Sequence, residues 1–224
     1  MESLSANLIS GPEQPASRAH GRCTSSNLLE RVEFLRLDAS RQLARPERGE
    51  YGQFLTPEPV ARLMASMFSH RSGTVSILDA GAGVGSLFAA AVAHLCSGGE
   101  LPAEVGVTAY EIDPLLLPYL SETMALCKQA CEVRGIRFTG TIRPVDFLRE
   151  TASLLSGGLF ADRPAEFTMS ILNPPYRKIH AESDARHQLR CIGPTLRNPL
   201  HTFQSSTLHQ GDALWRRDVI IQTL

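Results

Sequence analysis

The sequence predicts an α/β fold built on a parallel β-sheet, and three observations support this. Short apolar runs typical of strands alternate with helical segments between residues 75 and 172, a pattern that gives parallel strands joined by right-handed crossovers. A glycine-rich turn at residues 79–85 follows the first run. A polar residue ends each of four successive strands: Asp79, Glu111, Asp146 and Asn173. Ligands bind beyond the carboxyl ends of such strands, so we expect these four side chains to converge on one edge.

Two helices are expected before the sheet. The first begins at Asn27, which acts as N-cap with Glu30 in the position of a capping box, and its apolar residues fall at helical spacing. The second begins at Thr56, a hydroxyl N-cap followed by Pro57. The apolar positions of the first helix are Leu28, Val32, Leu35, Ala39 and Leu43. The expected buried stripe of the second is Val60, Leu63, Met64 and Met67, with the methionines as core filler.

The remaining pattern gives strands at 75–78, 105–110, 136–142 and 167–172, and helices at 86–96 and 113–134. The chain of 224 residues is long enough for one main core. Residues 1–26 are rich in Ser, Pro, Gly and Arg and are expected to form a flexible leader. The folded domain is assigned to residues 27–193, and residues 194–224 to a poorly defined tail.

The overall composition is that of a globular protein. Hydrophobic residues make up 43% and charged residues 20% of the chain, as in ordinary globular proteins. The formal net charge is −1, so any polyanion must be held by a local patch. The cysteine spacings build no zinc site, and Cys127 and Cys131 are expected to be free buried thiols, so no metal is predicted. No apolar run has the length of a signal peptide or a membrane span, which predicts a cytoplasmic protein without membrane contact.

The glycine turn indicates a nucleotide-like ligand that carries positive charge. Gly81 and Gly83 permit a tight turn and close approach of a ligand, but Ser86 stands where the dinucleotide fingerprint has its third glycine. An acid at the start of the turn, Asp79, suits a ligand with an ammonium and a sulfonium better than a pyrophosphate. Glu111 can accept hydrogen bonds from both hydroxyls of a ribose.

Asp146 and Phe147 complete the expected contacts to such a ligand. Asp146 can accept a hydrogen bond from an adenine amino group, with Phe147 against the ring face. Taken singly, each strand-end acid or amide is also explained as a helix cap or loop residue, and Phe147 as part of the core. The coincidence of four strand ends favours a site.

Asn173-Pro174-Pro175-Tyr176, directly after the fourth strand, resembles the fourth motif of amino-group methyltransferases. The lone pair of an exocyclic amine is delocalised into its ring and is a poor nucleophile. The side-chain oxygen of Asn173 and the backbone carbonyl of Pro174 could each accept a hydrogen bond from that amine and favour its sp³ character. The prolines restrict the backbone to an extended form, and Tyr176 could stack on a base extruded from a duplex. Asn-Pro-Pro is also a common turn sequence.

The segment from Tyr51 to Ala61 resembles the cofactor-binding segment of the gamma group of N6-adenine DNA methyltransferases, in which this segment precedes the glycine loop and the catalytic motif follows. The resemblance covers roughly residues 30–193 and is closest to restriction-modification methylases. It implies a class I S-adenosylmethionine-dependent, Rossmann-like fold, S-adenosyl-L-methionine as cofactor, and double-stranded DNA with a flipped adenine as substrate. Thr56 would meet the methionine end of the cofactor, and Asp79, Gly81, Gly83, Glu111, Asp146 and Phe147 would make the other contacts.

The C-terminal part departs from this family. Only residues 177–224 follow Tyr176, whereas the family continues through three more strands and a target-recognition domain. We therefore expect a truncated or frame-disrupted gene product, a sheet that is incomplete at this end, and a fourth strand that is a poorly covered edge. The DNA sequence recognised is not encoded in the visible motifs, and a partner restriction or recognition subunit stays open.

Four alternatives stay open. A protein-glutamine methyltransferase uses the same tetrapeptide, but its family resemblance lacks the segment around Thr56. RNA base N-methylation shares the catalytic logic. A dinucleotide dehydrogenase explains the glycine loop but leaves Asn173 to Tyr176 unexplained. A partial domain that binds the cofactor without methylating DNA is the non-enzymatic alternative.

Overall fold

The computed structural model describes residues 24–43, 55–69, 72–156, 167–173 and 219–221. Within these ranges the chain forms one five-stranded parallel sheet with the strand order β3-β2-β1-β4-β5. The α/β architecture with a parallel sheet is thereby confirmed. The strands are β1 (Thr74–Ala80), β2 (Glu104–Tyr110), β3 (Arg137–Arg143), β4 (Met169–Leu172) and β5 (Val219–Ile221). The helices are α1 (Ser25–Leu43), α2 (Glu58–Ser66), α3 (Ser86–Ser97), α4 (Leu117–Val133) and α5 (Phe147–Ser156).

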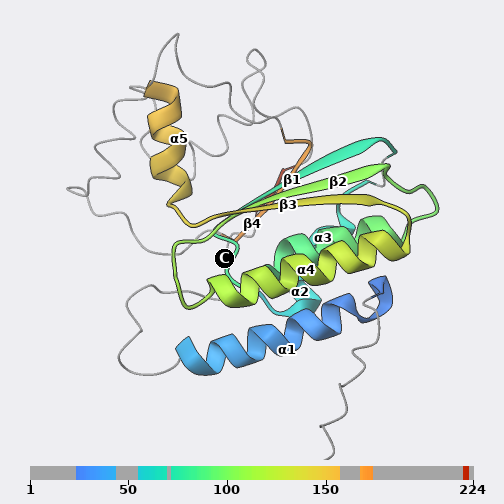
Figure 1. Ribbon diagram of the computed structural model, residues 1–224, viewed down its shortest axis with the longest axis horizontal. Coiled ribbons are helices and arrows are strands. Elements are labelled where there is room, and N and C mark those ends of the chain that lie inside the picture. The colour runs from blue at the N-terminus through green and yellow to red at the C-terminus, as the bar shows by residue number, and fades with distance from the viewer. Residues whose placement is uncertain (1–23, 44–54, 70–71, 157–166, 174–218, 222–224) are drawn as a thin grey trace, which may run out of the picture.

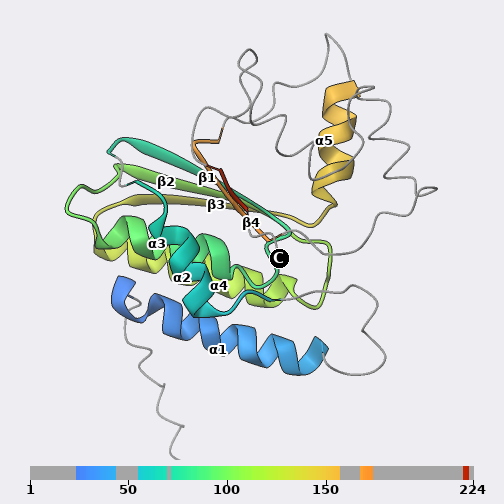
Figure 2. The ribbon, with the colours of Figure 1, turned by 180° about the vertical axis from the view of Figure 1, so that it is seen from behind.

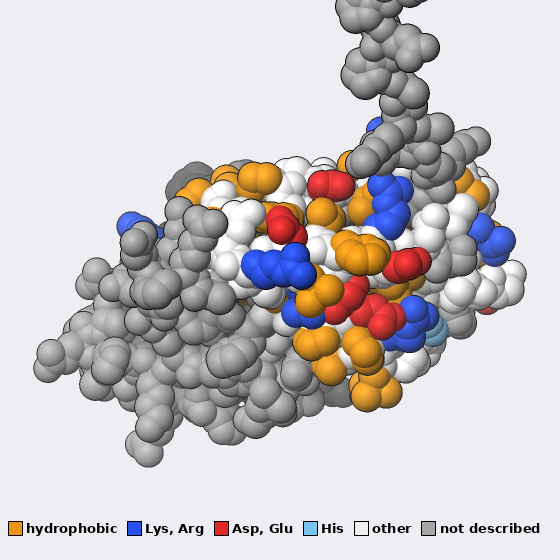
Figure 3. Space-filling model, turned by 90° about the horizontal axis from the view of Figure 1, so that it is seen from below, with side chains coloured by type: hydrophobic (Ala, Val, Ile, Leu, Met, Phe, Trp, Pro, Cys, Tyr) orange, Lys and Arg blue, Asp and Glu red, His pale blue; other side chains and the backbone are white. Residues whose placement is uncertain are grey.

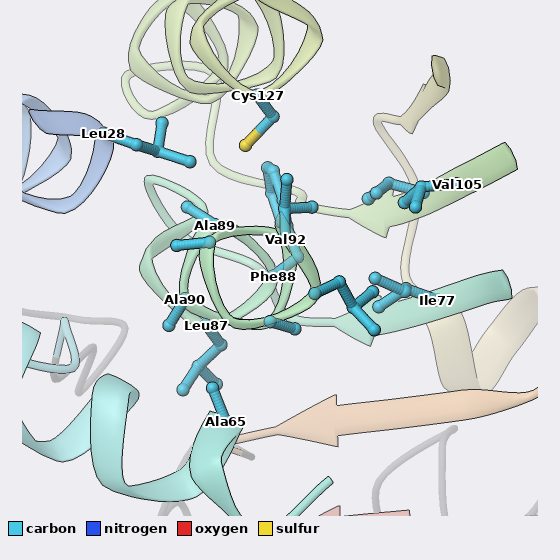
Figure 4. Packing of buried hydrophobic residues seen from close by; sticks show 14 of the residues in the cluster. Leu28, Ala65, Ile77, Leu87, Phe88, Ala89, Ala90, Val92, Val105 and Cys127 are labelled. Atoms are coloured by element: carbon cyan, nitrogen blue, oxygen red, sulfur yellow. The ribbon is translucent and has the colours of Figure 1, made fainter. Parts of the chain in front are cut away.

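Four helices cover one side of the sheet, and α5 lies on the other side (Figure 1, Figure 2). The helix α3 is at the centre of the core, where it contacts α1, α2, α4 and the sheet. Its side chains are apolar around nearly the whole circumference, as expected for a helix enclosed on all sides. Figure 4 shows Phe88 and Val92 of α3 facing the strands, with Ala65 of α2 and Leu28 of α1 packed on its other faces. This core fixes the strand ends that form the candidate site.

The helix α1 starts earlier than the sequence predicts. It begins at Ser25, and the first amides of the helix bond to the carbonyl of Thr24, which occupies the cap position. The side chain of Asn27 accepts a hydrogen bond from the backbone N–H of Thr24 at 2.8 Å, which is the reciprocal half of a capping box. The expected N-cap at Asn27 with Glu30 is therefore wrong by three residues. The apolar spacing was predicted correctly, since Leu28, Val32 and Ala39 are buried.

The helix α2 also differs at its start. It begins at Glu58 with Pro57 in the cap position and no side-chain cap. The backbone N–H of Glu58 donates instead to the carboxylate of Glu33 on α1, at 3.1 Å. That carboxylate is held by Arg36, whose hydrogen bonds lower the pKa of Glu33 and keep it charged beside the positive end of α2. The expected role of Thr56 as N-cap is therefore wrong.

The buried face of α2 was predicted only in part. Met64 is buried and Val60 partly buried, whereas Leu63 and Met67 are 61% and 62% exposed. Small alanines take their place: the buried residues of this stretch are Ala61, Met64, Ala65 and Phe68. Figure 3 shows the outer surface to which α1 and α2 contribute. Apolar side chains are interspersed with charged ones there.

The helix α4 begins at Leu117, because residues 114–116 form a turn closed by a bond from the N–H of Leu116 to the carbonyl of Asp113. The expected start at 113 is thus four residues early. Cys127 and Cys131 on this helix are buried thiols that form no disulfide within the described residues, as expected. None of the helices within the described ranges is both long and apolar enough to cross a bilayer.

The strand β5 was not predicted. It pairs in parallel with β4, with Ile171 opposite Ile220, so β4 has a neighbour on each side. The expectation that the fourth strand is a poorly covered edge is therefore wrong. Residues 219–221 pair with a strand that lies about fifty positions earlier in the sequence. The local sequence contains no signal for so distant a partner.

Candidate functional site

The strand order places the candidate site between β1 and β4. From β1 the chain proceeds outward through β2 to β3, and then returns to the other side of β1 to form β4. A crevice at the carboxyl ends is expected at this reversal of strand order. Asp79 near the end of β1 and Asn173 just after β4 lie on its two sides. The predicted convergence of these two residues at the sheet edge agrees with the topology.

The glycine turn connects β1 to α3 in a conformation that needs glycine. Gly81, Gly83 and Gly85 have φ angles of 88°, 59° and 89°, in the left-handed region. The N–H groups of Gly81 and Ala82 both donate to the carbonyl of Tyr110 at the end of β2, at 2.9 and 2.8 Å. Gly85 then forms the N-cap of α3. The turn is therefore anchored to the neighbouring strand and leads directly into the N-terminus of a helix.

Asp79 is a buried acid without a hydrogen-bonding partner in the described part of the chain. Its side chain has no solvent exposure, and neither carboxylate oxygen has a hydrogen bond there. Burial raises its pKa to about 8; the nearby backbone N–H of Phe88 opposes this rise, and the charge of Glu111 adds to it. An acid left in this state costs free energy that a cationic ligand could offset.

Glu111 holds the glycine turn in place. Its carboxylate accepts one hydrogen bond from the N–H of Gly83 at 2.7 Å and another from the N–H of Asp113 at 2.8 Å. The side chain is 5% exposed, and burial raises its pKa although these two bonds oppose the rise. Each carboxylate oxygen has a second lone-pair direction. Glu111 can therefore support the turn and still accept from a ligand.

Asp146 serves as the cap of α5. Its Oδ1 accepts hydrogen bonds from the N–H groups of Leu148 at 2.8 Å and Arg149 at 3.2 Å. The simpler explanation of this residue as a helix cap thus holds, while the cap uses only one of its two oxygens. Phe147, which is partly buried, packs edge-on against Tyr110 with ring centroids 5.0 Å apart.

Asn173 contacts the segment that precedes α2. Its Nδ2 donates a hydrogen bond to the Oγ1 of Thr56 at 2.9 Å, across 117 positions of sequence. The residue before, Leu55, packs over the glycine turn: its Cδ2 is 2.8 Å from the point where a Cβ on Gly83 would lie. Residues 55 and 56 therefore bridge the two sides of the strand-order reversal. Pro174, Pro175 and Tyr176 lie outside the described residues.

The predicted residues form three groups. Asp79, the glycine turn and Glu111 lie together, Asn173 lies against Thr56, and Asp146 and Phe147 form the start of α5. Sequence reasoning missed two side chains near Glu111: Tyr110, which packs on Phe147, and Ile112, an apolar residue that is 49% exposed. The only sequence feature that could have identified them is that each is next to Glu111, the acid at the end of β2.

Comparison with known proteins gives concordant matches. The family model described as N-6 DNA Methylase matches residues 39–198. The Type II methyltransferase M.BsuBI of Bacillus subtilis is 38% identical over 186 residues, which are 82% of this chain. The Type II methyltransferase M.PstI of Providencia stuartii is 32% identical over 83% of this chain. The chain spans 35% of the length of each of these relatives.

Among the solved structures that match is that of a modification subunit of a putative type I restriction enzyme from Vibrio vulnificus YJ016. It matches with a TM-score of 0.46 and 22% identity, over 68% of this chain and 29% of that one.

Proposed function

Since the chain belongs to the N-6 DNA methylase family, we propose that it carries the catalytic site for transfer of a methyl group from S-adenosylmethionine to N6 of adenine in DNA. The observation that carries this proposal is the position of Asn173. It follows β4 at the reversal of strand order, across from the buried acid Asp79. The two curated relatives, both named Type II methyltransferases, support a restriction-modification role.

The residues present fit this cofactor. The buried carboxylate of Asp79 lacks a hydrogen bond among the described residues, so a ligand with an ammonium and a sulfonium would offset its cost. The second lone pairs of Glu111 would accept from the ribose hydroxyls. The oxygen of Asp146 that does not cap α5 would accept from the adenine amino group. Phe147 and the exposed side chain of Ile112 offer apolar surface for the adenine ring.

Asn173 would act on the amino group that is methylated. When bound, S-adenosylmethionine supplies an electrophilic methyl group. The side-chain oxygen of Asn173 accepts a hydrogen bond from the target amine, and the carbonyl of Pro174 accepts a second one. These two bonds orient the amine and localise its lone pair on nitrogen. Tyr176 stacks on the extruded base and offsets part of the stacking lost from the duplex.

The test is transfer of a labelled methyl group from S-adenosylmethionine to unmethylated genomic DNA, with Asn173→Ala as the matched inactive variant. We expect label in DNA with the unaltered chain and a loss of at least about a hundredfold in the variant, because an acceptor that acts on the reacting amine is removed. Parallel reactions with RNA and with a glutamine-containing peptide address the two alternative N-methyl acceptors. Label in either of these and not in DNA would contradict the proposal.

Calorimetry separates cofactor binding from turnover. Asn173→Ala should bind S-adenosylmethionine and its demethylated product within a few-fold of the unaltered chain, since the proposed contacts to the cofactor come from other residues. An unaltered chain that binds neither compound would contradict the cofactor assignment.

A further inference from the structure

We infer that Thr56 is a positioning residue for Asn173: its hydroxyl fixes the carboxamide so that the side-chain oxygen of Asn173 faces the amino group to be methylated. This inference rests on the proposed function and assigns the Thr56 hydroxyl to Asn173 in place of the contact with the cofactor that the family resemblance implies. It is carried by the hydrogen bond from Nδ2 of Asn173 to Oγ1 of Thr56, at 2.9 Å.

The carboxamide of asparagine needs such a partner to present one particular atom. Its last torsion is broad, and a half-turn exchanges the accepting oxygen with the donating NH₂ group. With the NH₂ group towards the substrate, two donors would face each other and the amine would lose its acceptor. A bond that engages Nδ2 on one side therefore leaves Oδ1 directed elsewhere. An ordinary net hydrogen-bond contribution corresponds to about a fivefold preference for one orientation.

Thr56 is well placed to impose an orientation because it is held in place. It is 6% exposed. On one side, Leu55 packs over Gly83 of the glycine turn. On the other, Pro57 has an extended backbone with φ −64° and ψ 151°, and the N–H of Glu58 is bound by Glu33 of α1. The hydroxyl is thus attached to the helical core rather than to a freely rotating loop.

The arrangement also connects the two halves of the proposed reaction. The stretch that begins at Leu55 contacts the glycine turn, where the cofactor is proposed to bind, and at Thr56 it contacts Asn173, where the base is proposed to bind. One dipeptide therefore sets the position of the turn relative to the acceptor of the amine.

The test compares three variants. Thr56→Val removes the hydroxyl at nearly constant volume, and Thr56→Ser retains it. Thr123→Val is the matched control, because Thr123 on α4 is fully buried and its hydroxyl has no hydrogen bond within the described ranges. Two quantities are measured: the cofactor dissociation constant by calorimetry, and the rate of methyl transfer to DNA at saturating cofactor. The side-chain amide signals of Asn173 are followed by ¹⁵N NMR and assigned by their absence in Asn173→Ala.

We expect Thr56→Val to lower the saturated rate by about twofold, because a fivefold preference puts about five-sixths of the chains in the productive orientation and its loss leaves about half of them there. Thr56→Val should also shift the side-chain amide signals of Asn173. The dissociation constant of the cofactor should stay within about twofold, because the lost hydrogen bond is made to Asn173 and not to the cofactor. Thr56→Ser should restore both the rate and the signals, and Thr123→Val should change neither.

Unmoved Asn173 signals in Thr56→Val would overturn the inference. So would a weaker cofactor affinity with an unchanged saturated rate, because Thr56 would then act on the cofactor alone. If the unaltered chain transfers no methyl group, the proposed function fails for this chain, and the NMR comparison still decides whether Thr56 fixes the amide.

Discussion

Replacement of Asp79 by asparagine should stabilise the protein increasingly as the pH rises from 5 to 8. The folded chain keeps a proton on this acid up to its pKa of about 8, whereas an unfolded aspartate releases it near about 3.9. Between these values the folded state binds more protons than the unfolded state, so the free energy of unfolding falls as the pH rises. Stability from the protonated acid is complete below the unfolded pKa and is lost by the time the pH passes the folded pKa. Asparagine does not titrate and loses nothing.

The size of the effect follows from the same two values. The free energy of unfolding changes by about 1.36 kcal/mol per pH unit for one proton. The interval from pH 5 to 8 lies inside the window, with the slope halved near its upper end. We therefore expect the stability of Asp79→Asn relative to the unaltered chain to rise by about 4 kcal/mol over this interval. Solvent does not screen this carboxyl group, because the side chain of Asp79 has no exposure.

The assay is urea unfolding of both chains at pH 5, 6, 7 and 8. Glu122→Gln serves as control, because Glu122 is an exposed acid on α4 and its replacement also removes one carboxylate. A stability difference between Asp79→Asn and the unaltered chain that does not vary with pH would refute the reasoning, since Asp79 would then be ionised throughout. The same variant should bind S-adenosylmethionine more weakly, because asparagine, unlike Asp79, cannot lose a proton to give the negative charge proposed to face the cofactor.

Three further predictions concern the turn and its neighbours. Gly85→Ala should cost about 3 kcal/mol of stability, because the new Cβ would lie 2.5 Å from the ring of Phe88. Gly81→Ala has nearly the same φ but would place its Cβ in open space, so it should cost about 1 kcal/mol. Equal costs of the two variants in thermal unfolding would contradict this. Glu111→Gln loses one acceptor for a backbone N–H and should be about 1–2 kcal/mol less stable with weaker cofactor binding by calorimetry; unchanged affinity would remove it from the cofactor site. Asp146→Ala should cost about 1 kcal/mol through loss of the α5 cap, and Asp146→Asn much less, and the reverse ranking in urea unfolding would exclude the capping role.

The parts of the fold that the sequence predicted are those with local signals. The alternation of apolar strands and helices, and the glycine turn between residues 79 and 85, are patterns within short windows, and the structure reproduces them. The strand-end positions of Asp79, Glu111 and Asn173 follow from the same patterns together with the rule for parallel sheets.

Several of the errors occur where distant residues decide. Thr56 has the sequence of an N-cap, but the N–H of Glu58 is bound by Glu33 on another helix, and the Thr56 hydroxyl receives a bond from Asn173. Along α2, the apolar pattern emphasised large side chains, whereas close packing on α3 favours small ones such as Ala61 and Ala65. Hydrophobic periodicity alone does not distinguish these cases.

The identity of the methylated product tests the central claim most directly. DNA incubated with the chain and labelled S-adenosylmethionine is digested to nucleosides, and the labelled nucleoside is identified by mass spectrometry. If Asn173 after β4 acts on an exocyclic adenine amine, the label will be in N6-methyldeoxyadenosine with the unaltered chain and absent with Asn173→Ala. Label in a cytosine derivative, or equal N6-methyladenine from both chains, would contradict the account.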